Sequence, residues 1–240
     1  MSRCAKILLV LILLASAVLL AYKLLPRVTD CVESADVAHT QLTLSQIMRG
    51  LQAFQKDFDQ YPPSRFTDEP YDMKKYGGAG LLAYYLMGPK AGGWGGEDPQ
   101  VLPFGGTSGV PVPAYFGFDP KVVIVAEDMR PMGFADSFQP PRKILYFLAE
   151  PGREPLFDVR DNPVDATCKT GFASQEQLEM EAKRKGPDGK VDWICKDYLL
   201  ISPGPDRLYG PVVIDGKGRW RPAKPEEAAN SQYDDITNFD

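Results

Sequence analysis

Residues 44–63, LSQIMRGLQAFQKDFDQYPP, decide the fold of this chain. Apolar side chains recur in this stretch at spacings of three and four residues: Leu44, Ile47, Met48, Leu51, Phe54 and Phe58. Such spacing places the side chains on one stripe of an α-helix. Proline cannot continue a helix, so Tyr61-Pro62-Pro63 predicts an abrupt end. The stretch therefore predicts an amphipathic helix that must bury one face and that stops near residue 60.

The helix is expected to begin shortly after an apolar N-terminal segment. Pro26 marks the end of that segment or a kink within it. Asp30-Cys31-Val32-Glu33 resembles a capping box, which favours a helix start at this point. We therefore expect a stem helix within residues 26–60.

The segment before the stem is apolar enough to enter a membrane. Residues 7–22, ILLVLILLASAVLLAY, carry no charge. As a helix they would span about 24 Å, and Lys23 can extend its amine to the interface, so the effective span reaches Leu25. The alternative is a cleaved signal peptide with Ala15-Ser16-Ala17 at its cut site. Cleavage there would split the apolar run, so the sequence favours a transmembrane anchor over residues 1–25.

Charge is distributed unevenly along the 240 residues. Residues 1–27 contain four basic and no acidic side chains, which leaves 23 basic and 32 acidic side chains in the remainder. An acidic body repels nucleic acid, so no nucleic-acid partner is expected. The anchor has two basic residues on each side, which leaves its orientation open by the positive-inside rule. The acidic, proline-rich body is expected outside the cytoplasm.

The head, residues 61–240, is predicted to be a loop-rich α+β unit with an antiparallel sheet. Proline and glycine number 22 each in the chain, which favours short elements joined by loops. Short helices are expected at residues 80–87 and 174–185, strands at 122–125, 144–148 and 198–201, a hairpin at 212–221, and an irregular loop at 91–117. The stripe of the stem helix would pack against this sheet. A disulfide between Cys168 and Cys195 and two free thiols are both compatible with the sequence.

Two motifs carry a resemblance to a known family. The first is Leu51-x-x-Phe54-x-x-Asp57-x-x-x-Tyr61-Pro62-Pro63, which resembles the end of the pseudopilin stem. The second is Ser202-Pro-Gly-Pro-Asp206, followed later by an Asp-Ile segment in the tail, which resembles the end of the major pseudopilin of type II secretion. The combination of the two motifs resembles the pseudopilin-like proteins found in planctomycetes. The resemblance covers residues 64–140 poorly.

The resemblance implies a pilin-like fold and a non-catalytic role. The protein would be a single-pass subunit of the inner (cytoplasmic) membrane with an extracytoplasmic or periplasmic body. Its partners would be the membrane, other pseudopilins and inner-membrane components of a type II secretion or type IV pilus-like machinery, so it would act in protein transport. The prepilin leader is degenerate, because the cut would follow Cys4 instead of a glycine and Leu9 replaces the glutamate of the mature chain.

The resemblance also implies a possible calcium site. In the major pseudopilin the loop and the tail enclose Ca²⁺, which binds six or more oxygen ligands. The matching positions are Asp206 in the loop and Asp234 and Asp235 in the tail. Tyr233 replaces one of the alternating tail acids. The simpler interpretation is that these aspartates only stabilise turns.

Two further functions remain as alternatives. Carboxylates at Glu150, Glu154, Asp158 and Asp161 are spaced closely enough for the acid pair of a glycoside hydrolase, although such residues are usually solvated. The other alternative is a membrane-anchored binding module outside any filament, with contacts from the aromatic residues Trp94, Tyr115, Phe116 and Phe118. His39 is the only histidine, and no phosphate-binding loop or nucleophile elbow occurs, so no enzyme activity is expected.

Overall fold

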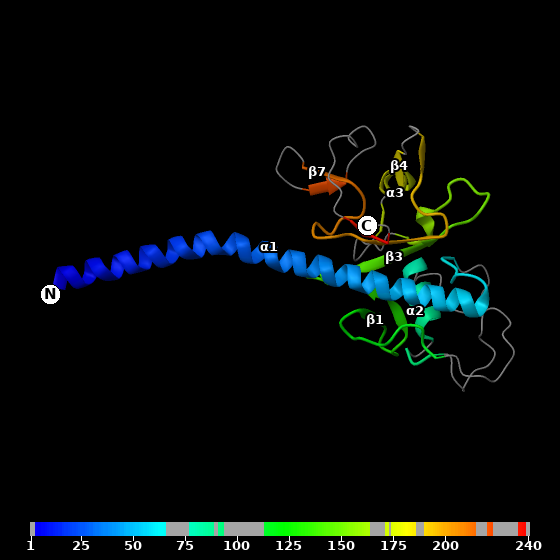
Figure 1. Cartoon of the computed structure of the whole chain (residues 1–240), viewed down its shortest axis with the longest axis horizontal. Helices are drawn as coiled ribbons and strands as arrows, with labels where there is room; N and C mark the ends of the chain where they lie inside the picture. Colours follow the sequence, from blue (N-terminus) through cyan, green and yellow to red (C-terminus); the bar gives the residue numbers. More distant parts are fainter. Residues whose placement is uncertain are drawn as a thin grey trace.

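The computed structural model describes residues 3–65, 77–88, 91–93, 113–163, 171–172, 174–185, 190–214, 220–222 and 235–238. For residues 3–30, and for 185, 212, 214 and 220–222, the description covers the backbone alone. The chain forms one long helix that carries an α+β head at its C-terminal end (Figure 1). The predicted α+β class with an antiparallel sheet is therefore confirmed.

The long helix α1 runs without interruption from Arg3 to Phe58. Pro26 lies inside it, so the expected helix start at Asp30 is wrong. Its N-terminal part extends away from the head, and its C-terminal part lies along the head (Figure 1). Within the described part of the chain no helix combines the length and apolar character needed to cross a membrane. The side chains of the expected anchor, residues 1–25, lie outside the described residues.

The apolar stripe of α1 packs into the head as the sequence predicted. Its members Leu44, Ile47, Leu51 and Phe54 are at most 2% exposed. The helix stops at Phe58, and Asp59 follows with a φ of +58°, just before the two prolines. Both the stripe and the stop are therefore confirmed.

The centre of the head is a five-stranded antiparallel sheet in the order β1-β2-β3-β6-β9. Its strands are β1 (Val123–Val125), β2 (Pro131–Ala135), β3 (Lys143–Leu148), β6 (Tyr198–Ser202) and β9 (Ile236–Thr237). The register pairs Leu145 with Ile201 and Tyr146 with Leu200. The strands expected at 122–125, 144–148 and 198–201 are confirmed, whereas β2 and β9 are additional.

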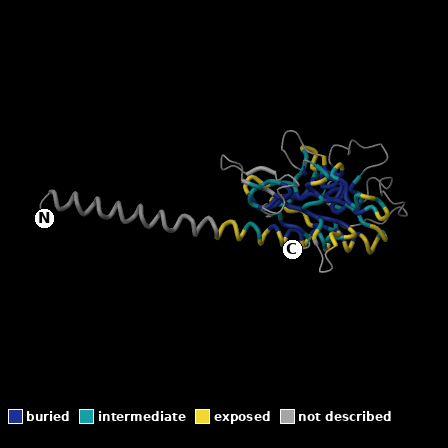
Figure 2. The backbone as a smooth tube through the Cα atoms, turned by 90° about the horizontal axis from the view of Figure 1, so that it is seen from above, coloured by how far each residue is buried: buried dark blue, intermediate teal, exposed yellow. Residues whose placement is uncertain are grey.

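Both faces of the central strands are buried. On one face, Ile144, Tyr146 and Leu200 join the core that contains the stripe of α1. On the other face, Phe147 and Leu199 join a second core. Successive side chains of a strand point to opposite faces, so a strand buried on both sides reads as a continuous apolar run. Figure 2 shows the resulting buried interior of the head.

Helix α2 (Gly77–Met87) contributes to the first core and packs against β2 and β3. All eleven of its residues are buried, so it is apolar around its whole circumference. It ends at Gly88, whose φ of +78° and N–H bond to the Tyr84 carbonyl form a left-handed cap. The predicted short helix is confirmed, and it begins three residues earlier than expected.

The second face of the sheet is covered by smaller elements. Helix α3 (Gln175–Ala182) and strand β5 (Val191–Trp193), which pairs with β4 (Lys183–Lys185), contribute to the second core, and the 3₁₀ turn η3 (Val159–Asp161) packs against it. A separate ribbon of the head pairs β7 (Val212–Ile214) with β8 (Trp220–Pro222), so the hairpin expected at 212–221 is confirmed. Ser174 caps α3 by accepting a hydrogen bond from the Gln177 N–H. The three basic residues expected in the last turn of this helix form β4 instead.

Candidate functional site

The resemblance singled out the loop after β6, which begins at Ser202. Asp206 stabilises this loop, because its Oδ1 accepts a hydrogen bond from the Leu208 N–H at 2.7 Å. Gly204 and Arg207 adopt positive φ angles of 64° and 65°, and the Arg207 N–H donates to the Gly204 carbonyl at 3.3 Å. Asp206 therefore holds a tight turn, as the simpler interpretation of the sequence requires.

The C-terminal tail is fixed beside this loop. Strand β9 pairs with β6, so that Ser202 lies opposite Ile236. Asn238 fastens the end of the tail, because its Oδ1 accepts a hydrogen bond from the Leu200 N–H at 2.8 Å. Asp235 joins the tail to the loop, because its Oδ2 accepts a hydrogen bond from the Gly210 N–H at 2.6 Å. Two of the three proposed metal ligands, Asp206 and Asp235, thus both form hydrogen bonds with the backbone of the same loop.

The fit of this structure to calcium is partial. Asp206 Oδ2 and Asp235 Oδ1 are buried, while the other oxygen of each carboxylate accepts a hydrogen bond from a backbone N–H. Among the described residues, no group of three or more histidine, cysteine, aspartate or glutamate side chains is gathered closely enough to hold a metal ion. Asp234 lies outside the described residues. Two carboxylates are too few for Ca²⁺ unless Asp234 and backbone carbonyls complete the set.

A further carboxylate, Asp136, lies under the same loop and was not expected from the sequence. It is 2% exposed, and its Oδ2 accepts a hydrogen bond from the Ser202 hydroxyl at 3.1 Å. The Arg142 N–H donates to its Oδ1 at 2.8 Å. Burial raises the pKa of Asp136, and these hydrogen bonds oppose that rise. Asp136 therefore ties the first residue of the loop to the connection between β2 and β3.

Three of the four carboxylates of the hydrolase alternative, Glu150, Asp158 and Asp161, belong to an ion network, whereas Glu154 lines a groove. Asp161 is 2% exposed and is held by Ser64 and Arg65. Asp158 contacts Arg160, Arg65 and Arg153, and the hydrogen bond from the Arg160 side chain is the main cause that holds its pKa well below the usual range. A groove of about 420 Å³ beside Trp193 is lined by Arg153 and Glu154, but neither Asp158 nor Asp161 reaches it.

The aromatic residues of the binding-module alternative are divided between core and surface. Phe116 is buried against Phe134, and the Tyr115 hydroxyl donates a hydrogen bond to Asp57 on α1 at 2.7 Å. Phe118 is 43% exposed, and Trp94 lies outside the described residues. Of the three described aromatics, only Phe118 is thus available to a partner.

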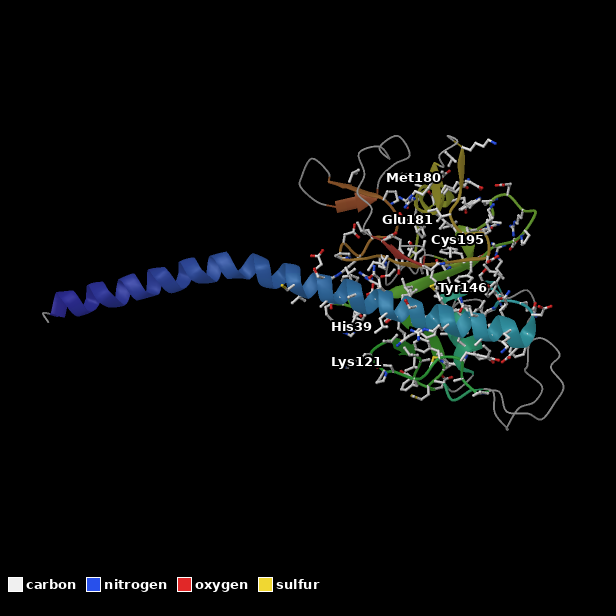
Figure 3. All side chains as sticks on the ribbon, in the orientation of Figure 1. His39, Lys121, Tyr146, Met180, Glu181 and Cys195 are labelled. Carbon is white, nitrogen blue, oxygen red and sulfur yellow. The ribbon has the colours of Figure 1, made fainter. Side chains whose placement is uncertain are left out.

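Two other singled-out residues occupy defined positions (Figure 3). His39 is exposed on α1. Cys195 is a half-buried free thiol whose sulfur accepts a hydrogen bond from Asn238 Nδ2 at 3.6 Å, and burial raises its pKa. The other cysteine of the possible bridge, Cys168, lies outside the described residues.

No family model, no curated protein and no solved structure matches this chain. The residues and geometry of the chain itself therefore carry the function proposed below.

Proposed function

We propose that this protein is a non-catalytic, pseudopilin-like subunit of a type II secretion or type IV pilus-like assembly. Residues 1–25 would anchor it in the inner membrane, and the head would lie outside the cytoplasm. The observation that carries the proposal is the helix from Arg3 to Phe58, which projects from the head at its N-terminal end and buries an apolar stripe in the head at its C-terminal end. A projecting helix with an uncharged run at residues 7–22 is suited to pack in a membrane and against other stems.

A stand-alone membrane-anchored binding module remains the second candidate, because Phe118 presents an apolar side chain to solvent. The two roles differ in how the N-terminus is processed. A pilin-type subunit loses its leader before assembly, whereas an anchored module keeps it.

We expect the protein from native membranes to begin at Ala5, the residue after Cys4, and intact mass with N-terminal sequencing will measure this. An intact Met1 would contradict incorporation into a filament and would favour the anchored module. A start at Val18 would contradict both roles, because a signal peptidase would have removed the anchor.

We further propose that Asp206, Asp234 and Asp235 hold a calcium ion that fastens the tail to the loop. Calcium that binds only the folded state should stabilise it by about 2.7 kcal/mol at one hundred times its dissociation constant. For a domain of this size that gain corresponds to roughly 5–10 °C in Tm. Thermal unfolding with 5 mM CaCl₂ or 5 mM EDTA, at about equal ionic strength, measures the difference.

The variant Asp235→Asn tests the ligand directly, because it keeps the shape of the side chain and removes its charge. The variant should lose the calcium-dependent rise in Tm. An equal Tm in calcium and EDTA for the unmodified protein would leave Asp206 and Asp235 as turn-stabilising residues only.

A further inference from the structure

The point where the chain leaves α1 is held by buried polar contacts to a turn far along the sequence. The Ser64 hydroxyl is 2.5 Å from Asp161 Oδ2, a contact across 97 residues. Arg65 Nη2 lies 2.5 Å from Asp161 Oδ1 and 2.7 Å from Asp158 Oδ2. The carboxylates are 1% and 6% exposed, so these ion pairs are largely shielded from water.

The same turn also holds the start of α2 and the centre of the sheet. Asn162 Oδ1 accepts a hydrogen bond from the Ala79 N–H at 2.9 Å, and Asn162 Nδ2 donates to the Tyr146 carbonyl at 2.6 Å. The Tyr146 hydroxyl returns to the stem exit, because it donates to the Pro62 carbonyl at 2.6 Å. The chain thus leaves this turn at Arg65 and returns to it at Gly77, which contacts the Asp161 carbonyl too closely to carry a side chain.

Charge in this region is balanced. Arg153 and Arg160 also contact Asp158, at 3.2 and 2.6 Å, and Glu150 pairs with both Arg65 and Arg153. Three guanidinium groups therefore face three carboxylates, those of Glu150, Asp158 and Asp161. Only the carboxylates of Asp158 and Asp161 are buried in this set, so removing Arg65 leaves their charge less well compensated where it is shielded from water, which is costly.

We propose that Ser64, Arg65, Asp158, Asp161 and Asn162 form a stem–head joint, a conformational device that makes the end of α1, the start of α2 and strand β3 move as one body. The apolar stripe of α1 and the two cores of the head hold the stem and the sheet by other contacts. Breaking the joint should therefore open the stem exit locally while the sheet stays folded. This coupling lies within the molecule and does not depend on the role proposed above.

The test is hydrogen–deuterium exchange of the full-length protein with and without Arg65→Ala. The Asp59 N–H donates to the Gln55 carbonyl and the Ala79 N–H to Asn162 Oδ1. In the variant we expect both amides to exchange about tenfold faster or more, because their local opening becomes easier. The amides of Leu145 and Ile201, which face each other across β3 and β6, should change less than about twofold.

Two other patterns would overturn the proposal. Equal acceleration at all of these amides would mean that Arg65 supports global stability only. Unchanged exchange at the stem exit would mean that the ion pairs do not couple the elements.

Control variants separate the joint from other charge effects. Arg130→Ala removes an ion pair with Asp128, whose side chain is 54% exposed and which contacts no member of the joint, so it should leave the exchange at Ala79 unchanged. If Arg65→Ala does not fold, Ser64→Ala provides the test, because it removes only the hydroxyl contact to Asp161 and should give the same pattern at smaller amplitude. Uniform or absent acceleration in Ser64→Ala would overturn the proposal in the same way.

Discussion

Replacing Gly78 by alanine should destabilise the head by about 3 kcal/mol, near the upper end of the usual overpacking cost. A Cβ at this position would lie 2.2 Å from the Tyr146 carbonyl oxygen and 3.3 Å from the Ser64 side chain. The carbonyl belongs to the middle of β3, which pairs with β6 on its other side, so the strand cannot easily move away. The first turn of α2 would have to shift instead.

Urea unfolding of the full-length protein, followed by tryptophan fluorescence, measures this change. The urea concentration at half-unfolding should fall, while the dependence of the free energy of unfolding on urea concentration stays unchanged. A loss of about 3 kcal/mol corresponds to roughly 6–12 °C in Tm for a domain of this size. Gly117→Ala is the matched control, because a Cβ there would meet nothing within 4 Å. A loss below about 1 kcal/mol for Gly78→Ala would mean that α2 relaxes away from β3, contrary to the close packing of this turn.

The start of α2 also shows where local sequence signals fail. Glycine is a poor helix former, so Gly77 and Gly78 favour a loop, and the sequence predicted a start at residue 80. The helix nevertheless begins at Gly77, and glycine is required in its first turn because the Asp161 carbonyl and β3 leave no room for side chains. Tertiary packing, which the local pattern does not contain, decides this boundary. By contrast, the stripe and stop of α1 depend only on local spacing and on proline, and both were predicted.

Strand β2 escaped prediction for a similar reason. Its sequence, PMGFA, contains proline and glycine, which are rare within strands. It becomes a strand because Phe134 pairs with Ile144 on β3 and Val123 on β1. Asp136 follows directly after this strand. Because the sequence did not predict β2, it could not predict that the Asp136 carboxylate would lie beside Ser202.

The candidate site was predictable in part. The resemblance pointed to the loop at Asp206 and to the tail at Asp235, and the structure joins them through Gly210. The pairing of Asp158 and Asp161 with Arg65 was out of reach, because Arg65 lies more than ninety residues earlier in the chain. Periodicity relates residues within one element and carries no information about pairs that only the fold brings together.

The second large effect is expected from Phe54→Ala on the buried stripe of α1, with a loss of about 3–5 kcal/mol in the free energy of unfolding. Phe54 is 1% exposed and forms ring contacts with Phe58, Tyr85 and Tyr115, at centroid distances of 4.5, 6.0 and 5.5 Å. Truncation removes these contacts and leaves a cavity that the surrounding rings fill only partly.

Leu42→Ala on the same helix is the matched control for Phe54→Ala. Leu42 is 49% exposed, so its truncation should change stability by no more than about 0.5 kcal/mol. Urea unfolding of both variants distinguishes burial of the stripe from a general change in helix propensity, because each substitution introduces alanine into α1. Equal effects of the two variants would mean that the head does not depend on the stem for its core. A loss confined to Phe54→Ala would mean that the stem's apolar face is an integral part of the folded head.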